Sequence, residues 1–265
     1  MLIIPANSLS SGFSVNFSCR FTDGSSDYFN RTNVGTVTDN KKFTLSQWIK
    51  RDTIGTNQRL YGCADTSPGY LTQEIYSFGT DNKFYYQHRL SGADVSYRST
   101  TNPAYTSTSV WYHLVLAVDT TQGTSTNRVK IYVDGTQVST TQSGYPSSAY
   151  IPQNNPVWIN YASQDNQLGA LAGNSTFDGN MAEVVLIDGQ QLDPTSFGED
   201  DDGTWKPIDV SDLTFGNNGA YLEFKQTGTG QNSSGLGADT SGNDNHYGVN
   251  NLTSGDQSTD TPTSW

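Results

Sequence analysis

The clearest secondary-structure pattern in this chain is the stretch Arg128-Val129-Lys130-Ile131-Tyr132-Val133-Asp134-Gly135. Its valine and isoleucine residues alternate with Lys130 and Tyr132, which is the two-residue period of a β-strand with one buried face. Asp134-Gly135 then precedes Thr136-Gln137-Val138. An Asp-Gly pair between two such runs is a strong signal for a tight turn, so this stretch predicts an antiparallel β-hairpin.

The run Trp111–Asp119, upstream of this hairpin, alternates less clearly because successive residues from Leu114 to Val118 are all apolar. That pattern is typical of a central strand covered on both sides. Further strand-like runs recur between clusters of Gly, Asn, Asp and Ser, as in an all-β sandwich or barrel. All the predicted strands are Phe13–Phe21, Phe43–Lys50, Glu74–Phe78, Phe84–Arg89, Trp111–Asp119, Arg128–Val133, Val157–Tyr161, Met181–Ile187 and Ala220–Lys225.

The composition favours the same fold class. Of 265 residues, 32 are Thr, 30 Ser, 22 Asn and 26 Gly, whereas Glu occurs four times and Lys and Arg seven times each. Strong helix formers are therefore scarce, and turn and β-branched residues are abundant, which disfavours a helical bundle or an α/β enzyme. The one predicted helical turn is Asp193–Gly198, where Asp193 can cap it, Pro194 suits the first position and Gly198 can close it.

The net charge of −12 and the pI of about 4.4 limit the partners of this chain. An acidic surface repels phosphate, so we expect no binding to nucleic acid. No apolar run approaches 18 residues, so we expect no membrane insertion, and the opening MLIIPANSLSSG lacks the features of a secretory signal. Cys19 and Cys63 are either two buried thiols or, if their strands are neighbours, a disulfide.

We expect a single domain over residues 1–265. It would consist of an N-terminal arm (1–12), a sandwich (13–225) and an irregular C-terminal segment wrapped over the sandwich (226–265). The composition shifts to Gly, Ser, Asn, Thr and Asp after about residue 226, for which the alternative is a disordered tail. Possible anchors of a wrapped segment are spaced along it: His246, Tyr247, Val249, Leu252 and Trp265.

The chain offers little material for catalysis. A glycan hydrolase on such a scaffold needs two carboxylates close together, and jelly-roll glucanases carry them on one strand as Glu-x-Asp-x-(x)-Glu. None of the four glutamates stands in that pattern, since Glu183 and Asp188 are five apart and face opposite sides of a strand. The three histidines lack metal-ligand spacing, and no nucleophile elbow or phosphate loop occurs. We therefore expect a protein that is not an enzyme.

Calcium is the one cofactor for which the sequence supplies ligands; otherwise we expect none. The loop Asp239–Asn245 is rich in oxygen atoms, and its candidate ligands are Asp239, Asn243 and Asp244. It does not match the twelve-residue EF-hand template. Asx turns that hold the backbone would use the same side chains, so both interpretations remain open.

An ordered series of motifs resembles the laminin-G-like, concanavalin A-like jelly roll. The motifs are Phe43-Thr44-Leu45-Ser46-Gln47-Trp48-Ile49-Lys50, Trp111-Tyr112-His113-Leu114-Val115, Val129-Lys130-Ile131-Tyr132-Val133-Asp134-Gly135 and Phe177-Asp178-Gly179. Their order and spacing fit that family from about Phe21 to Leu192. The resemblance implies an antiparallel two-sheet jelly-roll sandwich.

Other segments are similar to a form of this jelly roll found in virion proteins of tailed bacteriophages. They are Phe21–Thr32, Ala182–Glu199, Trp205-Lys206-Pro207, Tyr221-Leu222-Glu223-Phe224, Asp239-Thr240-Ser241-Gly242-Asn243 and Asp260-Thr261-Pro262-Thr263. This resemblance implies a noncatalytic structural protein displayed on the virion as a head decoration or a tail or fibre component. Assembly would take place in the host cytoplasm, and the partners would be capsid or tail proteins and further copies of this chain.

The resemblance also implies lectin-like binding of host-surface glycan. Aromatic and amide side chains in loops could stack on sugar faces and accept hydrogen bonds from hydroxyl groups. The candidate ligand-binding residues are Tyr145, Tyr150, Tyr161, Asp165 and Asn166. The alternative is a purely structural decoration or attachment protein that binds no sugar, and a glycan-degrading enzyme is a third, disfavoured class.

Overall fold

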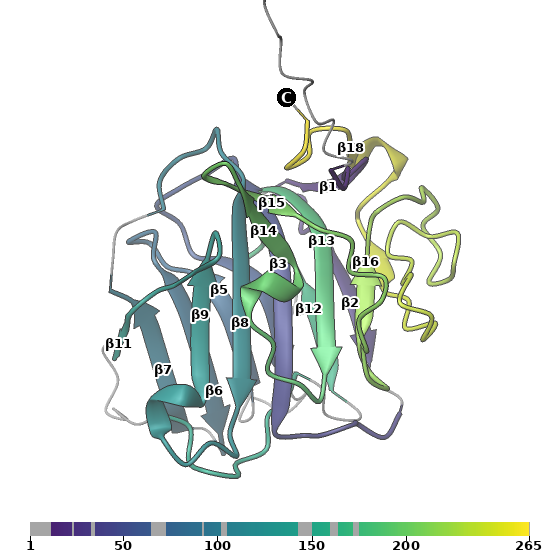
Figure 1. Cartoon of the computed structure of the whole chain (residues 1–265). Coiled ribbons are helices and arrows are strands. Elements are labelled where there is room, and N and C mark those ends of the chain that lie inside the picture. The colour runs from purple at the N-terminus through teal and green to yellow at the C-terminus, as the bar shows by residue number, and fades with distance from the viewer. Residues whose placement is uncertain are drawn as a thin grey trace, which may run out of the picture.

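The computed structural model describes residues 12–22, 24–32, 35–64, 73–91, 93–101, 105–142, 150–159, 164–171 and 175–264 (Figure 1). They form two large antiparallel β-sheets, a two-stranded ribbon and three short 3-10 helices, which is the predicted all-β jelly-roll sandwich. The helices are η1 (Ser125–Asn127), η2 (Pro194–Ser196) and η3 (Ser254–Asp256). No helix in the described ranges is long and apolar enough to cross a membrane.

In the first sheet, sheet A, strand β13 pairs with three other strands. The order of this sheet in space is β10 (Thr136–Gln137), β9 (Val129–Val133), β8 (Tyr112–Asp119), β3 (Lys42–Arg51), β13 (Gly179–Asp188), β1 (Ser18–Phe21) and β18 (Gln257–Ser258), and β16 (Ala220–Leu222) also pairs with β13. β13 thus pairs with β1 near its start and with β16 near its end. Its register against β3 shifts between Ala182 and Val185, where Glu183 has a φ of 48°.

The second sheet, sheet B, forms the other layer of the sandwich. Its order in space is β11 (Thr140–Gln142), β7 (Ala93–Thr100), β6 (Phe84–Leu90), β5 (Gln73–Phe78), β4 (Gln58–Ala64), β12 (Asp165–Leu168), β2 (Tyr28–Thr32) and β17 (Gly248–Asn250). The ribbon of β14 (Gly198–Asp201) and β15 (Thr204–Pro207) belongs to neither sheet and lies over the outer face of sheet A (Figure 1).

The main core lies between the two sheets. On β8, Leu114, Leu116 and Val118 point into it and are fully buried. Val115 and Ala117 point to the outer face of sheet A, where they are covered by a second apolar cluster that includes Phe197, Phe215 and Tyr221. The weak alternation of this run therefore does correspond to a central strand covered on both sides.

Most of the predicted strands are present, with small shifts at their ends. The structure describes residues 157–159 of the predicted strand Val157–Tyr161. The prediction is wrong for them, because they form a loop, although the side chains of Val157 and Ile159 are both buried. Phe13–Phe21 is also too long, since only Ser18–Phe21 pairs. Strands β2, β4, β7 and β12 were not predicted, because their polar or glycine-containing sequences lack a clear period.

The two predicted turns are confirmed, with one correction. Asp134 and Gly135 have φ values of 46° and 76° and connect β9 to β10. The Asp193 side chain accepts a hydrogen bond from the Thr195 amide and caps η2, with Pro194 at its first position. Gly198 does not close this helix, because it already belongs to β14. A Cβ atom at Gly198 would lie 2.7 Å from Trp205 Nε1, so this glycine makes room for the indole.

The segment from residue 226 to residue 264 runs over one edge of both sheets. β17 pairs with β2 in sheet B, and β18 pairs with β1 in sheet A. Tyr247 and Leu252 are buried in the core between these strands, as anchors would be. Figure 1 shows this segment in yellow beside β16, β1 and β2. Of the predicted N-terminal arm, residues 1–11 lie outside the described part of the chain.

Cys19 and Cys63 are two separate buried thiols rather than a disulfide. Cys19 lies on β1 of sheet A and Cys63 on β4 of sheet B, so their strands are not hydrogen-bonded neighbours. The Cys63 Sγ–H donates to the carbonyl oxygen of Trp158 at 3.1 Å. Burial raises the pKa of the Cys19 thiol, which keeps it protonated and unreactive.

Candidate functional site

The aromatic residues predicted to bind glycan are only partly described. Tyr145 and Tyr161 lie outside the described residues. Tyr150 is half-buried, and its ring centre is 4.0 Å from the guanidinium carbon of Arg98. The Tyr150 hydroxyl also accepts a hydrogen bond from Arg98 Nη2 at 3.1 Å. In this arrangement Tyr150 holds the buried Arg98, which is a structural role.

Asp165 and Asn166 point to opposite faces of β12, so the structure does not bring them together. Asn166 is 0% exposed, on the core side of sheet B. Asp165 lies on the outer face, where its two carboxylate oxygens accept hydrogen bonds from Asn30 Nδ2 at 3.2 Å and Gln167 Nε2 at 2.7 Å. Asp165 therefore belongs to a polar network across β12 and β2, and Asn166 does not reach the surface.

The loop predicted to bind calcium is held by the hydrogen bonds of Asp239. One carboxylate oxygen accepts from the amides of Tyr221 and Ser241, and the other accepts from the Ser241 hydroxyl and the Asn245 amide, at 2.8–2.9 Å. Asn243 donates to backbone carbonyls, and the Asp244 side chain is 91% exposed. Asp239 and Asn243 thus use their side chains to hold the loop, and no group of three or more His, Cys, Asp or Glu side chains that could hold a metal ion occurs among the described residues.

A different group of residues lines a cavity with aromatic walls. It lies on the outer face of sheet A, at the end where β3 finishes and β8 begins. Trp48 on β3, Trp111 just before β8 and Trp205 on β15 line a cavity of about 330 Å³. The remaining lining residues are Asp134, Asp200, Gly203 and Thr204. We call this cavity the tryptophan pocket.

His113 fixes two of the three indoles. Its ring stacks on Trp48, with 4.7 Å between ring centres, and lies nearly parallel to Trp205 at 6.0 Å. Its Nδ1 accepts a hydrogen bond from Trp205 Nε1 at 2.8 Å, so the proton of the neutral ring resides on Nε2 and is donated to Ser46 Oγ, also 2.8 Å away. Burial lowers the pKa of His113 to about 3, which keeps the ring neutral at physiological pH.

The third indole, that of Trp111, is fixed by the ion pair of Asp260 and Lys50. Trp111 Nε1 donates to one oxygen of Asp260 at 3.1 Å, and the other oxygen of Asp260 is 2.7 Å from Lys50 Nζ. Trp111 and Trp205 thus both use their indole N–H groups inside the protein. What they offer a ligand is their ring surface, held in place before any ligand arrives.

Two carboxylates add polar groups to the tryptophan pocket. Asp134 accepts a hydrogen bond from the His113 amide at 2.7 Å through one oxygen, and Asp200 accepts one from the Gly203 amide at 3.0 Å. Each acid therefore orients its own turn and keeps its other oxygen available as an acceptor. Desolvation by the surrounding protein raises the pKa of Asp134, against the opposing effect of its hydrogen bond from His113.

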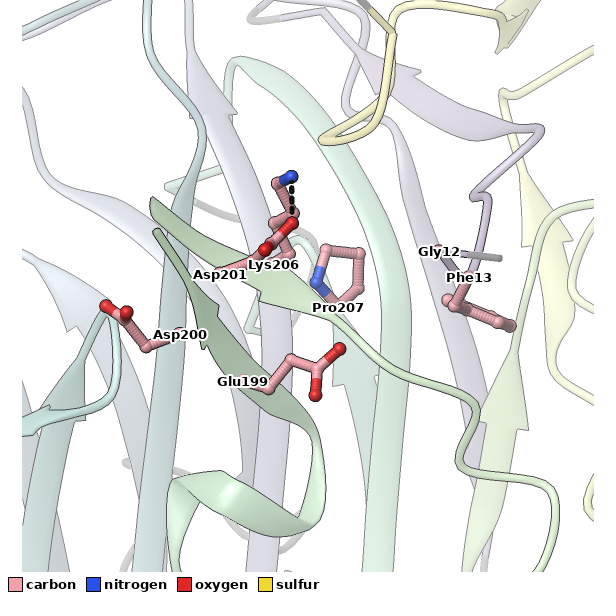
Figure 2. A pocket seen from close by; sticks show the side chains of 7 residues that line it. All are labelled: Gly12, Phe13, Glu199, Asp200, Asp201, Lys206 and Pro207. Atoms are coloured by element: carbon pink, nitrogen blue, oxygen red, sulfur yellow. Dashed lines mark hydrogen bonds and ion pairs between the residues drawn. The ribbon is translucent and has the colours of Figure 1, made fainter. Parts of the chain in front are cut away.

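A second hollow lies on the other side of the β14–β15 ribbon. It measures about 300 Å³ and is lined by Gly12, Phe13, Glu199, Asp200, Asp201, Lys206 and Pro207. Figure 2 shows Asp200 pointing away from Glu199, and Asp201 paired with Lys206, whose Nζ is 2.5 Å from the Asp201 oxygen. The ribbon thus separates an acidic hollow from the aromatic one, and Asp200 lines both.

The buried acid Glu183 lies outside these hollows. Glu183, at the bulge of β13, is 6% exposed and accepts a hydrogen bond from the Tyr221 hydroxyl. Burial raises the pKa of Glu183 to about 7, although the Tyr221 hydrogen bond lowers it. Its partner Tyr221 belongs to the second apolar cluster, and the charged residues Glu223, Lys225 and Asp209 also act on the pKa of Glu183.

The strand sequence, rather than the composition of the loops, indicates one residue of the tryptophan pocket. In Phe43–Lys50, the buried Phe43, Leu45 and Ile49 share one parity, so Trp48 must point to the other face. An outward tryptophan on a strand is costly unless it is covered or functional. Trp205 comes from a segment far along the chain, and its position over Trp48 follows only from the tertiary structure.

The comparisons with known proteins agree with this fold. The family sequence model described as "Concanavalin A-like lectin/glucanases superfamily", a laminin-G type, matches residues 23–193, which is more than half of the chain. This chain belongs to that superfamily. The match ends near the position expected from the motif series and leaves the C-terminal segment outside it. A search of curated protein sequences gives no significant match to this concanavalin A-like chain.

Solved structures similar to this superfamily member are distant in sequence. A heptameric pentraxin from Limulus polyphemus is 13% identical, with 68% of this chain and 80% of that chain covered and a TM-score of 0.45. A Ruminococcus gnavus sialidase carbohydrate-binding module bound to α2,3-sialyllactose is 13% identical, covering 62% and 87%, with a TM-score of 0.43. Domain 4 of a Geobacillus stearothermophilus arabinanase, bound to arabinotriose, is 16% identical, covering 69% and 79%, with a TM-score of 0.45.

Proposed function

We propose that this chain is a noncatalytic glycan-binding protein displayed on the surface of a tailed-bacteriophage particle. The observation that carries the glycan-binding part is the tryptophan pocket, which three immobilised indoles and two carboxylates line together. The superfamily of the chain and the sugar complexes among its structural neighbours are consistent with this function.

The chemistry of the tryptophan pocket suits a sugar ring. A pyranose presents C–H groups on its faces and hydroxyl groups around its rim. Indole faces pack against the C–H surface, and carboxylates accept hydrogen bonds from the hydroxyl groups. Trp111 and Trp205 supply ring surface, and Asp134 and Asp200 supply acceptors. The volume of about 330 Å³ is at the small end for ligand sites, so the pocket suits one or two sugar units.

The noncatalytic part of the proposal rests on how the acids are used. Glycoside hydrolysis needs one carboxylic acid that donates a proton and one carboxylate that attacks or activates water. Glu183 has the raised pKa of a general acid but is bonded to Tyr221 of the second apolar cluster. Asp134 and Asp200 each hold a turn through one oxygen. These arrangements favour binding over bond cleavage.

The virion part of the proposal rests on the motif series in the sequence. Segments along nearly the whole chain, from Phe21 to Thr263, are similar to virion proteins of tailed phages. Mass spectrometry of purified particles tests it, with a stoichiometric amount of this chain as the expected result. If the chain is missing from purified particles, the virion location is wrong.

A glycan array followed by tryptophan-fluorescence titration tests the glycan-binding part. We expect Trp205→Ala and Trp111→Ala to weaken binding about tenfold or more, because each removes a pre-positioned ring from the site. Trp205→Phe should retain part of the affinity, which separates loss of a ring from misfolding. Tyr28→Ala, a half-buried aromatic on sheet B, is the control and should leave affinity unchanged.

The same titration defines the outcomes that would contradict the proposal. If no glycan binds at millimolar concentration while the chain occupies virions stoichiometrically, the structural role replaces glycan binding. If bound glycan is cut and releases reducing sugar, the protein is an enzyme and the noncatalytic assignment fails.

A further inference from the structure

A third cavity lies on the opposite side of the molecule, on the outer face of sheet B. It measures about 270 Å³, and the side chains that matter here come from four adjacent strands. Arg59 comes from β4, Ser77 from β5, Tyr85 and Gln87 from β6 and Tyr97 from β7. The register places Arg59 opposite Ser77, Ser77 opposite Tyr85, and Gln87 opposite Tyr97. We call this cavity the arginine groove.

The two tyrosines form a rigid wall of the groove. Their rings stack with 5.5 Å between centres and 29° between planes. Tyr85 Oη donates to Asp81 Oδ2 at 2.9 Å. Its ring also lies directly against Gly79, where a Cβ atom would come within 2.5 Å of it. The absence of a side chain at Gly79 thus allows the Tyr85 ring to lie where it does.

Arg59 is the cation of the groove, and its guanidinium makes few contacts. It donates one hydrogen bond, from Nη1 to Ser77 Oγ at 3.1 Å, and among the described residues it has no carboxylate partner. By contrast, Arg128 donates to the carbonyl oxygens of Gln122, Gly123 and Ile151. A guanidinium has five N–H donors, so most of those on Arg59 are left for solvent or ligand.

Partial burial of the Arg59 guanidinium makes the small number of its hydrogen bonds more costly. Arg59 is only partly exposed, and desolvation lowers its pKa. A cation removed from water without a counter-ion is destabilised, and an anion bound beside it would offset that cost. The chain has 26 acidic residues, yet none of those described neutralises this cation.

We propose that the arginine groove binds the carboxylate of an acidic sugar. The planar guanidinium can hold a carboxylate through two parallel hydrogen bonds. The Tyr85–Tyr97 pair can pack against the sugar ring, and Gln87 and Ser77 can bond its hydroxyl groups. A single cation in a chain of net charge −12 does not suit a nucleic acid, which requires several phosphate contacts.

This site is independent of the tryptophan pocket, because the two lie on the outer faces of opposite sheets. NMR titration of the ¹⁵N-labelled chain with methyl β-D-glucuronide and methyl β-D-glucoside tests it, since these sugars differ only in the carboxylate. We expect the glucuronide to bind about tenfold or more tightly and to shift the amides of Arg59, Ser77, Gln87 and Tyr97. Sodium acetate, a carboxylate without a sugar, should bind more weakly than the glucuronide.

Variants assign the effect to Arg59. Arg59→Gln should reduce glucuronide affinity to that of the glucoside, and Arg59→Lys should retain part of the difference. Arg20→Gln removes the same charge from the surface pair with Asp52, and we expect it to change affinity less than about twofold. Thermal unfolding of each variant, together with glycan binding at the tryptophan pocket, reports whether the fold is kept.

Three results would overturn the proposal. The first is equal binding of glucuronide and glucoside to the unmodified chain. The second is full glucuronide affinity in a folded Arg59→Gln protein. The third is acetate binding as strong as that of the glucuronide, which would make the groove a simple anion site. None of these results bears on the tryptophan pocket, whose failure would appear in the Trp205→Ala titration instead.

Discussion

The outer faces of sheets A and B are built in opposite ways. On sheet A, apolar residues such as Val115 point outward and are covered by the segment that carries Phe197, Phe215 and Tyr221. On sheet B, the outward residues around Arg59 and Tyr97 are polar and line an open groove. The outward residues of each strand thus determine whether a sheet needs a third layer. One candidate site lies beside the apolar layer over sheet A, and the other lies among the polar residues on the outer face of sheet B.

Removing an aromatic ring from each face should give the largest difference. Phe197→Ala should lower the free energy of unfolding by about 3–5 kcal/mol, because it opens a cavity beneath the cover of sheet A. Tyr97→Ala should cost about 1 kcal/mol or less, because its ring lies at the rim of an open groove. Urea denaturation of the two variants measures both values. Equal losses would mean that the cover contributes little to stability.

The buried acid bonded to Tyr221 should make stability depend on pH. The pKa of Glu183 is about 7 in the folded chain against 4.5 as a free side chain, so the folded state retains this proton at higher pH. Its contribution is complete below pH 4.5 and is lost as the pH rises through 7. Relative to Glu183→Gln, the unmodified chain should lose about 3 kcal/mol over that range.

The measurement is the difference between the two proteins in urea denaturation at several pH values. His113 acts in the opposite direction, since its pKa falls from 6.5 to about 3 on folding and its stabilisation is lost as the pH drops. That effect is present in both proteins and cancels in their difference. A difference that does not change with pH would show that Glu183 is solvated.

Gly135 and Gly203 test whether the β9–β10 turn holds Trp205 in the tryptophan pocket. Gly135 and Gly203 have φ values of 76° and 82°, so alanine is strained at either position. A Cβ at Gly135 would lie 2.5 Å from the Trp205 ring, whereas one at Gly203 meets nothing within 4 Å. Gly203→Ala should cost about 1 kcal/mol, and Gly135→Ala about 2–3 kcal/mol.

The two alanine variants should also differ in their fluorescence spectra. Gly135→Ala should shift the tryptophan emission and weaken glycan binding, because Trp205 must move. Gly203→Ala should leave the emission unchanged, because a Cβ atom there meets no other atom within 4 Å. Identical behaviour of the two variants would indicate that Trp205 is not packed on the β9–β10 turn.

The smallest expected effect concerns calcium. Both oxygens of Asp239 already accept two hydrogen bonds each within the loop. We therefore propose that calcium is not a cofactor of this loop, and that millimolar calcium or a chelator changes the melting temperature by less than about 1 °C. A larger rise with calcium, abolished in Asp244→Asn, would reinstate the metal site.

The spacing of apolar residues predicted those strands in which the strand's own sequence shows which face is buried. Val129–Val133 with its Asp-Gly turn and the doubly covered Tyr112–Asp119 are examples. Strands such as β2 and β12 could not be predicted this way, because their polar side chains form a network with each other on the surface of sheet B. Their pairing is decided by neighbours that are distant in sequence.

The candidate sites were harder to predict, because each combines residues from several strands. Tyrosine and asparagine in loops suggested sugar binding, yet Tyr150 holds Arg98 and Asn166 is buried. The parity of Trp48 pointed to the outer face of sheet A, but only the folded chain places Trp205 and Asp134 around it. A sequence shows which face a side chain occupies more readily than which partners meet there.

The C-terminal segment has a consequence for how the chain acquires its fold. β17 completes the edge of sheet B at β2, and β18 completes the edge of sheet A at β1. During synthesis the β2 edge therefore stays unpaired until residues 248–250 have left the ribosome, and the β1 edge until residues 257–258 have done so. Unpaired strand edges are sites of association between chains, so truncation within this segment should favour aggregation of the nascent protein. Two strands made late in this chain, β17 and β18, thus protect two strands made early, β2 and β1.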